Sequence, residues 1–281
     1  MTIENGKVRR VAVKMGLVAE YPAEKQNEAE DTAQRVQTSP RKSVVQVRFP
    51  NRNMTLAYYN DRFDLHRGDM VYVDGKLEGR VGCVTEVNYN FKIKISDYKR
   101  VIAVVDTTVH GRFFMAGSHF VTFDREALPI SRVIRWFKAP PKEEEEFVSG
   151  SDDTVFCLDD FNGMKISQAI VERGHEYYLE NRVRYISIDG TKGYAIVEGS
   201  ESYEVEFEYR NGEVGQLICS CFCSYNCKHE FAAMLQLKET LELIEKNYAD
   251  EYERTGYFAA INKGMLFAFA IDGKDTGSFT L

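Results

Sequence analysis

Residues 217–229 read Leu217-Ile218-Cys219-Ser220-Cys221-Phe222-Cys223-Ser224-Tyr225-Asn226-Cys227-Lys228-His229. Four of the six cysteines and one of the five histidines of the chain fall between Cys219 and His229. Thiolate sulfur and imidazole nitrogen are the donors that zinc prefers, and a structural zinc ion takes four of them in a tetrahedron. This stretch therefore predicts a single structural zinc site.

Two ligand sets compete for the first half of that site. The second pair of donors, Cys227 and His229, is the same in both sets, whereas the first pair is either Cys219 and Cys221 or Cys221 and Cys223. The first choice leaves a loop of residues 222–226 between the pairs, and the second leaves a tighter loop of residues 224–226. We favour the longer loop and predict the ligands Cys219, Cys221, Cys227 and His229, with Cys223 as the alternative ligand.

The flanking sequence predicts a hairpin before the cysteines and a helix after them. Residues 203–209 alternate apolar and charged side chains with the period of a half-buried strand, and a turn at 210–213 leads into a returning strand that ends near Cys219. Apolar residues at helical spacing, Phe231, Met234, Leu237, Leu241 and Ile244, follow the second donor pair. A metal ion between these elements would join a hairpin end to a helix start, where it supplies folding free energy.

Cys-Ser-Cys, a short loop and Cys-Lys-His before a helix resemble the SWIM-type zinc finger, whose pattern is CxC, a variable loop and CxH. The resemblance covers about residues 165–245, through Arg173-Gly174, Val183 and the segment from Val197 to Ser200. Membership would imply zinc and binding of DNA or protein. Cys223 has no role in the family pattern.

Other metal chemistries do not match the spacing. Neither His229 nor His175, each followed by Glu, has a second histidine at the fifth position, so the HExxH metalloprotease motif is absent. A phosphate-binding loop, a GxSxG nucleophile elbow and a dinucleotide fingerprint are also missing from the sequence. We therefore predict a protein that is not an enzyme, without catalytic residues and without a bound nucleotide.

The charge of the chain is divided between its halves. Residues 1–140 hold 23 Lys and Arg against 16 Asp and Glu, whereas residues 141–281 hold 13 against 27. Phosphate would be attracted to the first half and repelled by the second. No apolar run is long enough to cross a membrane, and the start of the chain lacks a signal peptide, so we expect a cytoplasmic protein.

Short strands with Gly turns dominate the first half, at 44–49, 54–59, 70–73, 80–87 and 91–95. They predict a small antiparallel β-barrel-like domain, which loosely resembles SH3-like or KOW-type barrels. Bases and aromatics interleave near its end and in the amphipathic segment 131–138, a mixture that can bind nucleic acid. The candidate nucleic-acid-binding residues are Lys92, Lys94, Lys99, Arg100, Arg132 and Arg135.

Pro140-Pro141, an acidic run and a Ser/Gly stretch read as a linker over residues 139–153. The predicted fold is α+β: an N-terminal strand and polar arm (1–43), a β-rich barrel-like domain (44–138), the linker (139–153) and a SWIM-type zinc-binding domain (154–281). In the last of these we expect a helix over 163–181 interrupted at Gly174, two strands over 182–200 and two further strands over 257–271 and 278–281.

The leading functional hypothesis is a zinc-stabilised adaptor in nucleic-acid metabolism, with the first half near DNA or RNA and the second half on a protein partner. The alternative is a pure protein–protein interaction module, such as a bacterial or phage accessory factor, that binds no nucleic acid.

Overall fold

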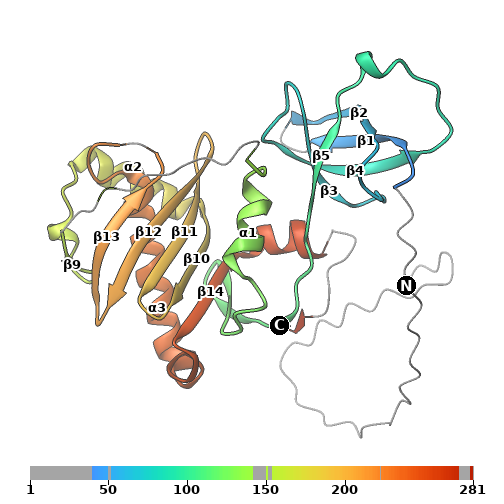
Figure 1. Cartoon of the computed structure of the whole chain (residues 1–281). Coiled ribbons are helices and arrows are strands. Elements are labelled where there is room, and N and C mark those ends of the chain that lie inside the picture. Colours follow the sequence, from blue (N-terminus) through green and yellow to red (C-terminus); the bar gives the residue numbers. More distant parts are fainter. Residues whose placement is uncertain are drawn as a thin grey trace, which may run out of the picture.

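The structure is a computed structural model that describes residues 40–49, 52–141, 150, 154–221, 223–271 and 279–280. It is built on two large antiparallel sheets, one of five strands and one of eight, with the α1 helix between them (Figure 1). The predicted α+β class is confirmed. The predicted N-terminal arm, apart from its last residues, and most of the predicted linker lie outside the described residues.

The five-stranded sheet has its own apolar core. Its order is β2-β1-β4-β3-β5, with bounds β1 Ser43–Phe49, β2 Met54–Asn60, β3 Met70–Val73, β4 Val81–Asn88 and β5 Val101–Val105. The buried side chains between its strands include Val45, Val47, Val71 and Val84, each fully buried. The sheet curls, and the Tyr59 N–H donates to the Lys99 carbonyl at 2.9 Å, but the strands do not close into a barrel.

Four of the five strands predicted in this region are confirmed, and the fifth is wrong. Residues 91–95 form an extended loop that runs into a 3-10 turn, Ile95–Asp97. Both edges of β4 are already paired, with β1 on one side and β3 on the other, so the following segment cannot fold back on β4 as a hairpin strand. Residues 91–95 therefore alternate apolar and polar side chains although they do not pair with another strand of the described residues.

The eight-stranded sheet has the order β7-β8-β14-β10-β11-β12-β13-β9. Its strands are β7 Phe114–Ala116, β8 His119–Thr122, β9 Phe156–Cys157, β10 Val183–Asp189, β11 Lys192–Glu198, β12 Ser202–Arg210, β13 Glu213–Cys219 and β14 Tyr257–Asn262. A separate two-stranded parallel pair joins β6, Gly111–Arg112, to β15, Phe279–Thr280. The predicted hairpins at 182–200 and 203–219 are confirmed.

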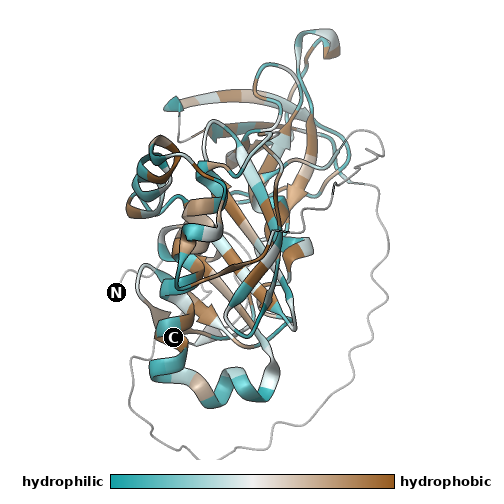
Figure 2. Cartoon of the chain, turned by 90° about the vertical axis from the view of Figure 1, so that its left-hand side faces the viewer, coloured by the Kyte–Doolittle hydropathy of each residue, from teal (hydrophilic) through white to brown (hydrophobic). Residues whose placement is uncertain are grey.

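The central strands of this sheet are buried on both faces, and β14 shows how. Phe258 and Ala260 face a core shared with α2 (Gln168–Leu179) and α3 (Lys228–Thr255). Ala259 and Ile261 face a second core on the opposite side, which holds Val133 and Trp136 of α1 (Ile130–Phe137). Figure 2 shows hydrophobic residues along the strands and hydrophilic ones along much of the helices. None of the helices in the described part of the chain is long and apolar enough to span a membrane.

The sheets do not follow the predicted domain boundary at 139–153. β7, β8 and α1, which we assigned to the barrel-like domain, belong to the eight-stranded sheet and its second core, because β8 pairs with β14. The chain passes from one sheet to the other between Val105 and Phe114. The composition of residues 139–153 predicted a linker between domains. The eight-stranded sheet is instead defined by backbone pairing between β8 and β14, which are far apart in the sequence.

Two further predictions about the C-terminal half need correction. α2 runs through Gly174 without interruption. Residues 257–271 form a strand only as far as Asn262, whose side-chain Oδ1 accepts hydrogen bonds from the Gly264 and Met265 N–H groups and starts α4 (Lys263–Leu266). A π-helical turn, Phe267–Ile271, follows.

Candidate metal centre

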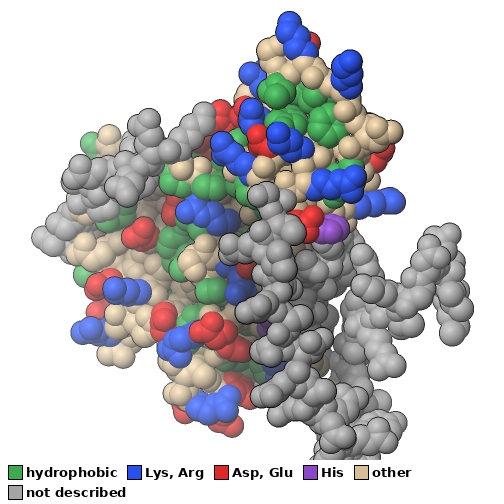
Figure 3. Space-filling view, turned by 45° about the vertical axis from the view of Figure 1, so that its right-hand side comes forward, with side chains coloured by type: hydrophobic (Ala, Val, Ile, Leu, Met, Phe, Trp, Pro, Cys, Tyr) green, Lys and Arg blue, Asp and Glu red, His purple; other side chains and the backbone are tan. Residues whose placement is uncertain are grey.

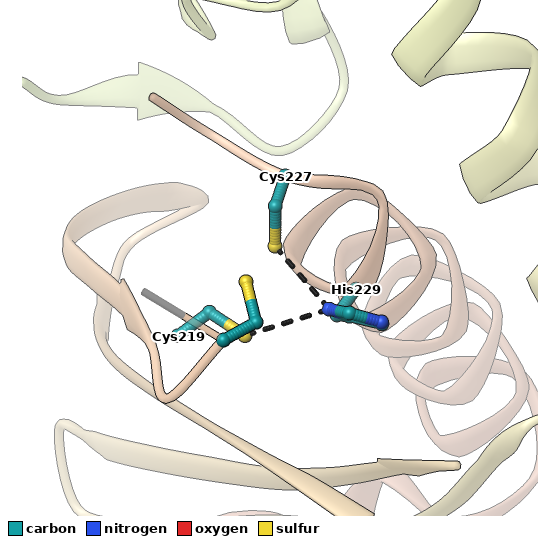
Figure 4. A group of neighbouring side chains, drawn as sticks. Cys219, Cys227 and His229 are labelled. Carbon is teal, nitrogen blue, oxygen red and sulfur yellow. Dashed lines mark hydrogen bonds between the residues drawn. The ribbon is translucent and has the colours of Figure 1, made fainter. Parts of the chain in front are cut away.

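Three elements bring four donor side chains together at one end of the eight-stranded sheet. Cys219 is the last residue of β13, Cys221 lies in the turn that follows, Cys227 caps α3 and His229 stands in its first turn. One donor atom from each lies within 4.8 Å of the other three. Figure 4 shows Cys219, Cys227 and His229 turned toward a common centre. Cys223 is exposed and outside this group.

The spacing of these donors matches a ligand tetrahedron. His229 Nδ1 lies 3.8 Å from Cys219 Sγ and 3.7 Å from Cys227 Sγ. Zinc–sulfur and zinc–nitrogen bonds of about 2.3 and 2.0 Å in a tetrahedron require sulfur–nitrogen edges of about 3.5 Å. The two sulfur–nitrogen separations lie within about 0.3 Å of that value, and all four donor atoms lie within 4.8 Å of one another. The four residues therefore form a Cys3His group positioned to hold a metal ion.

His229 is held in the neutral form that a metal ligand needs. Burial, and next the charge of Lys228, lower the pKa of the imidazole from 6.5 to about 4. The ring stacks on Tyr203, with centroids 4.2 Å apart, and Tyr177 meets it edge-on at 5.5 Å. Its Nδ1 faces the sulfurs of Cys219 and Cys227, whereas its Nε2 is buried and has no hydrogen-bond partner among the described residues.

The thiols hold their protons tightly when no cation balances them. The pKa of Cys227 is raised first by the hydrogen bond with Cys219, then by burial and by the charge of Glu230. Burial raises the pKa of Cys221 to about 12, and a hydrogen bond to the Cys223 thiol adds to the rise. Metal binding at this group must therefore release protons, which makes metal affinity depend steeply on pH.

The start of α3 is tied to the donors by a capping box. Cys227 Sγ accepts from the Glu230 N–H at 3.5 Å, and Glu230 Oε2 accepts from the Cys227 N–H at 2.6 Å. Asn226 Nδ2 also donates to Glu230 Oε2, and Asn226 Oδ1 accepts from the Lys165 N–H. One sulfur thus serves both as helix cap and as candidate ligand, which fixes the second donor pair relative to the helix.

α2 packs against the first turn of α3, next to the donor residues. A Cβ at Gly174 would lie 2.8 Å from Phe231 Cδ1 and 3.0 Å from the Lys228 carbonyl oxygen, so the helices approach at a position where only glycine fits. Lys228 and Arg182 each place a cation about 4.6 Å from the Tyr177 ring centre. The first turn of α3 is therefore held by packing as well as by its cap.

Sequence reasoning missed the groups that support the donors. Glu230 was visible in principle, because Cys227 and Glu230 have the spacing of an N-cap and N3 pair. Gly174 entered only through the family resemblance, and Tyr177 and Tyr203 had no such signal, since these contacts depend on how α2 and β12 pack against α3.

The six basic residues predicted to bind nucleic acid fall into two groups. Lys92, Lys94 and Lys99 are exposed on the segment between β4 and β5. The arginines are engaged within the protein: Arg100 pairs with Asp61, Arg132 with Asp106 and the Thr108 carbonyl, and Arg135 with the Ala139 carbonyl. The three lysines thus lie together on one segment of the five-stranded sheet, whereas Arg132 and Arg135 lie on α1.

Comparison with known proteins gives one informative match. The uncharacterized protein MJ1493 of Methanocaldococcus jannaschii is 36% identical to this chain over 90 residues, which is 32% of this chain and 36% of that protein. The chain thus matches little more than a third of the relative's length. No family model and no solved structure matches the chain.

Proposed function

We propose that the Cys3His group binds one zinc ion and that the surrounding unit is a SWIM-type zinc finger. The donor set supports this, because three thiolates and one imidazole complete a tetrahedron and leave no open position for a reacting water. Zinc with three thiolates carries a net negative charge, and the positive end of the α3 dipole lies beside it. The proposed role of the metal is therefore to hold the hairpin β12–β13 against α3.

Metal analysis of the purified chain tests this part of the proposal. We expect one zinc ion per chain, lost in Cys219→Ser, Cys227→Ser and His229→Ala and retained in Cys223→Ser. Retention of zinc in Cys219→Ser with loss in Cys223→Ser would contradict the ligand assignment. A metal-free chain with every thiol reactive would refute the zinc site.

We further propose that the five-stranded sheet binds single-stranded nucleic acid, and that the chain is an adaptor in nucleic-acid metabolism. The observation that supports this is the division of charge along the two sheets. Residues 40–105 contain twelve Lys and Arg against seven Asp and Glu, whereas residues 106–281 contain eighteen against thirty. Figure 3 shows Lys and Arg side chains gathered, with hydrophobic ones among them, over the part of the molecule formed by the five-stranded sheet.

The segment between β4 and β5 carries the mixture of groups that such a ligand needs. Lys92, Lys94 and Lys99 are exposed and can contact phosphates. Tyr89 is 36% exposed, and the Arg41 guanidinium lies 4.3 Å from the centre of its ring. Exposed aromatic rings with adjacent cations stack on unpaired bases at a gain of about 1–3 kcal/mol per base.

The acidic eight-stranded part repels phosphate, which favours a protein partner for that part of the chain. The same acidity favours the alternative function, a protein–protein interaction module without nucleic acid. Both functions need the zinc-stabilised fold, so nucleic-acid binding itself must separate them.

A salt titration of binding to a labelled oligonucleotide provides that separation. The full chain should bind single-stranded DNA or RNA with an affinity that falls steeply with salt. Replacing Lys92, Lys94 and Lys99 by Gln should lower the slope of log K against log salt by about 2, at about 0.7 per phosphate contact. The matched control removes three exposed charges from the other sheet and its helix, by Lys192→Gln, Arg210→Gln and Lys246→Gln, and should leave the slope unchanged.

Equal losses in the two triple variants would refute the segment between β4 and β5 as the site of nucleic-acid binding, and absence of binding at low salt would refute the nucleic-acid function. A protein-only module would then remain as the better account of the fold.

A further inference from the structure

A pocket lies where the two sheets and the end of α1 meet. Its volume is about 420 Å³, within the range of about 300–1,000 Å³ that is usual for the sites of small ligands. The turn between β3 and β4, the end of α1 and the turn between β11 and β12 line it. The pocket therefore requires both sheets and belongs to neither of them alone.

The walls of the pocket carry charges of both signs around an aromatic ring. The charged and aromatic side chains that line it are Glu78, Arg80, Phe137, Lys138, Glu198 and Glu201. Two of these charges are neutralised within the protein, since Lys138 pairs with Glu204, and Glu198 pairs with Arg184 at 2.6 Å.

Arg80 and Glu201 are the charged groups best placed to meet a ligand. Both are exposed, and neither side chain forms an ion pair within the described part of the chain. Phe137 is half-buried, with its ring centre 6.3 Å from that of Phe269. A ligand that matches this wall is flat, accepts hydrogen bonds from a guanidinium and donates hydrogen bonds to a carboxylate.

The pocket is continuous with the basic segment between β4 and β5. Lys99 lies against the β3–β4 turn, since a Cβ at Gly75 would be 3.1 Å from its Cγ and Cε atoms. The backbone of that turn is also tied to the segment: the Asp74 N–H donates to the Arg100 carbonyl at 2.9 Å, and the Arg100 N–H donates to the Asp74 carboxylate. A strand whose phosphates contact this segment therefore has the pocket beside it.

The opposite wall of the pocket rests on the candidate metal centre. The Gly199 N–H donates to the Glu201 carbonyl at 2.7 Å, which closes the β11–β12 turn. A Cβ at Gly199 would lie 2.9 Å from Tyr203 Cε2 and 3.2 Å from His229 Nε2, so the turn packs directly on these stacked rings. Ser200 Oγ and the Tyr203 hydroxyl share a hydrogen bond of 2.8 Å. The turn that carries Glu201 is thus fixed before any ligand binds, which reduces the entropy lost on binding.

We propose that this pocket binds a guanine base of a single-stranded nucleic acid. The inference rests on the nucleic-acid function proposed above for the five-stranded sheet. Guanine presents N1–H and N2–H side by side, so one carboxylate can accept both, and it presents O6 and N7 as paired acceptors for an arginine. Glu201 accepts from the first pair, Arg80 donates to the second, and the base lies beside the Phe137 ring.

The other bases match these groups less well. Thymine and uracil present a single N–H donor on the same edge, so one oxygen of the carboxylate would stay unpaired. Adenine and cytosine carry an amino group but have no ring N–H next to it. A preference for guanine is therefore the property that separates this pocket from a sequence-independent contact with phosphates.

Fluorescence anisotropy with the full chain tests the preference. The probes are a labelled oligothymidine and the same strand with one central guanine. The guanine strand should bind about tenfold more tightly, because a bidentate base contact discriminates by a factor of about 5 to 150. Glu201→Gln keeps the size of the side chain but loses one acceptor, and should reduce the preference to about twofold or less. The matched control, Glu213→Gln, removes the same charge from an exposed position at the other end of β12–β13 and should keep the full preference.

The ratio of the two affinities is the deciding quantity, since the loss of one charge changes the binding of both strands alike. Equal affinities in the native chain would overturn the inference, as would a ratio that Glu201→Gln leaves unchanged. Strands with one central adenine or cytosine that bind as tightly as the guanine strand would also overturn it. In each of these cases the proposed function stands, because the oligothymidine is still bound. A chain that binds neither strand at low salt would instead contradict the nucleic-acid function itself.

Discussion

Replacing Gly174 by Ala tests whether the close approach of α2 and α3 supports the metal centre. In an isolated helix this change would be favourable by about 1 kcal/mol, because glycine is a poor helix former. Here the added Cβ would lie 2.8 Å from Phe231 Cδ1 and 3.0 Å from both Phe231 Cβ and the Lys228 carbonyl oxygen. Phe231 is 5% exposed and has little room to move, so the helices must separate.

Overpacking of this kind costs about 1–3 kcal/mol, which equals or exceeds the gain in helix propensity. We therefore expect Gly174→Ala to lower the free energy of unfolding of the zinc-loaded chain by up to about 2 kcal/mol. Because the Lys228 carbonyl belongs to the turn that holds Cys227 and His229, the variant should also lose zinc to a competing chelator more readily.

Denaturant unfolding and chelator competition measure the two effects. Ala169→Gly, at an exposed position in the first turn of the same helix, calibrates helix propensity. The double variant Gly174→Ala/Phe231→Leu should be less destabilised than the sum of the single changes, since the two residues touch. A Gly174→Ala chain that is more stable than the native one would refute the reasoning, because the interhelix contact would then tolerate a methyl group.

Three further predictions follow from contacts around the two sheets. Glu230→Gln keeps the size of the capping side chain but removes the charge that accepts the Cys227 N–H, and should destabilise the chain by about 1 kcal/mol in thermal or denaturant unfolding; an unchanged stability would contradict the cap. His119 is fully buried, and burial lowers its pKa to about 4. The unfolded chain therefore takes up the proton first, and stability should fall by up to about 3 kcal/mol as the pH drops from about 6.5 to 4; unfolding at several pH values should show a shallower fall in His119→Gln. The Tyr72 hydroxyl, on the five-stranded sheet, donates to the Arg135 carbonyl of α1 at 3.1 Å, so Tyr72→Phe should lower stability by about 1 kcal/mol; no loss would show that this link between the sheets is replaced by water.

Local sequence patterns correctly predicted the features formed by residues that are close together in the sequence. The four donors lie within eleven residues, so their spacing alone pointed to one site, and the hairpins at 182–200 and 203–219 are contiguous in sequence. The pairing of β8 with β14 joins Val121 to Ala260, and no local pattern reports a partner so distant in the chain. The domain boundary was therefore predicted from composition alone, which did not reveal that β7 and β8 of the first half belong to the sheet of the second half.

The basic helix α1 shows the same limit for side chains. Its sequence indicated a basic amphipathic segment over residues 131–138, and the structure forms a helix there with Val133 and Trp136 buried. Charge alone then assigned Arg132 and Arg135 to a nucleic-acid surface. In the fold these guanidinium groups meet backbone carbonyls, at Thr108 and Ala139, because the ends of nearby loops expose acceptors that the sequence does not reveal.

The position of the Cys3His group follows from where the apolar core ends. Val205 and Leu217 still pack against α3, but beyond them β13 and the start of α3 converge with few apolar side chains left to join them. Unsatisfied N–H groups gather at a helix start, and apolar packing cannot accept their hydrogen bonds. Cys227 resolves both difficulties, because its sulfur accepts the Glu230 N–H and can also bind a metal shared with the hairpin. A metal ion at this corner can therefore provide cohesion where a larger hydrophobic side chain would leave the helix start unsatisfied.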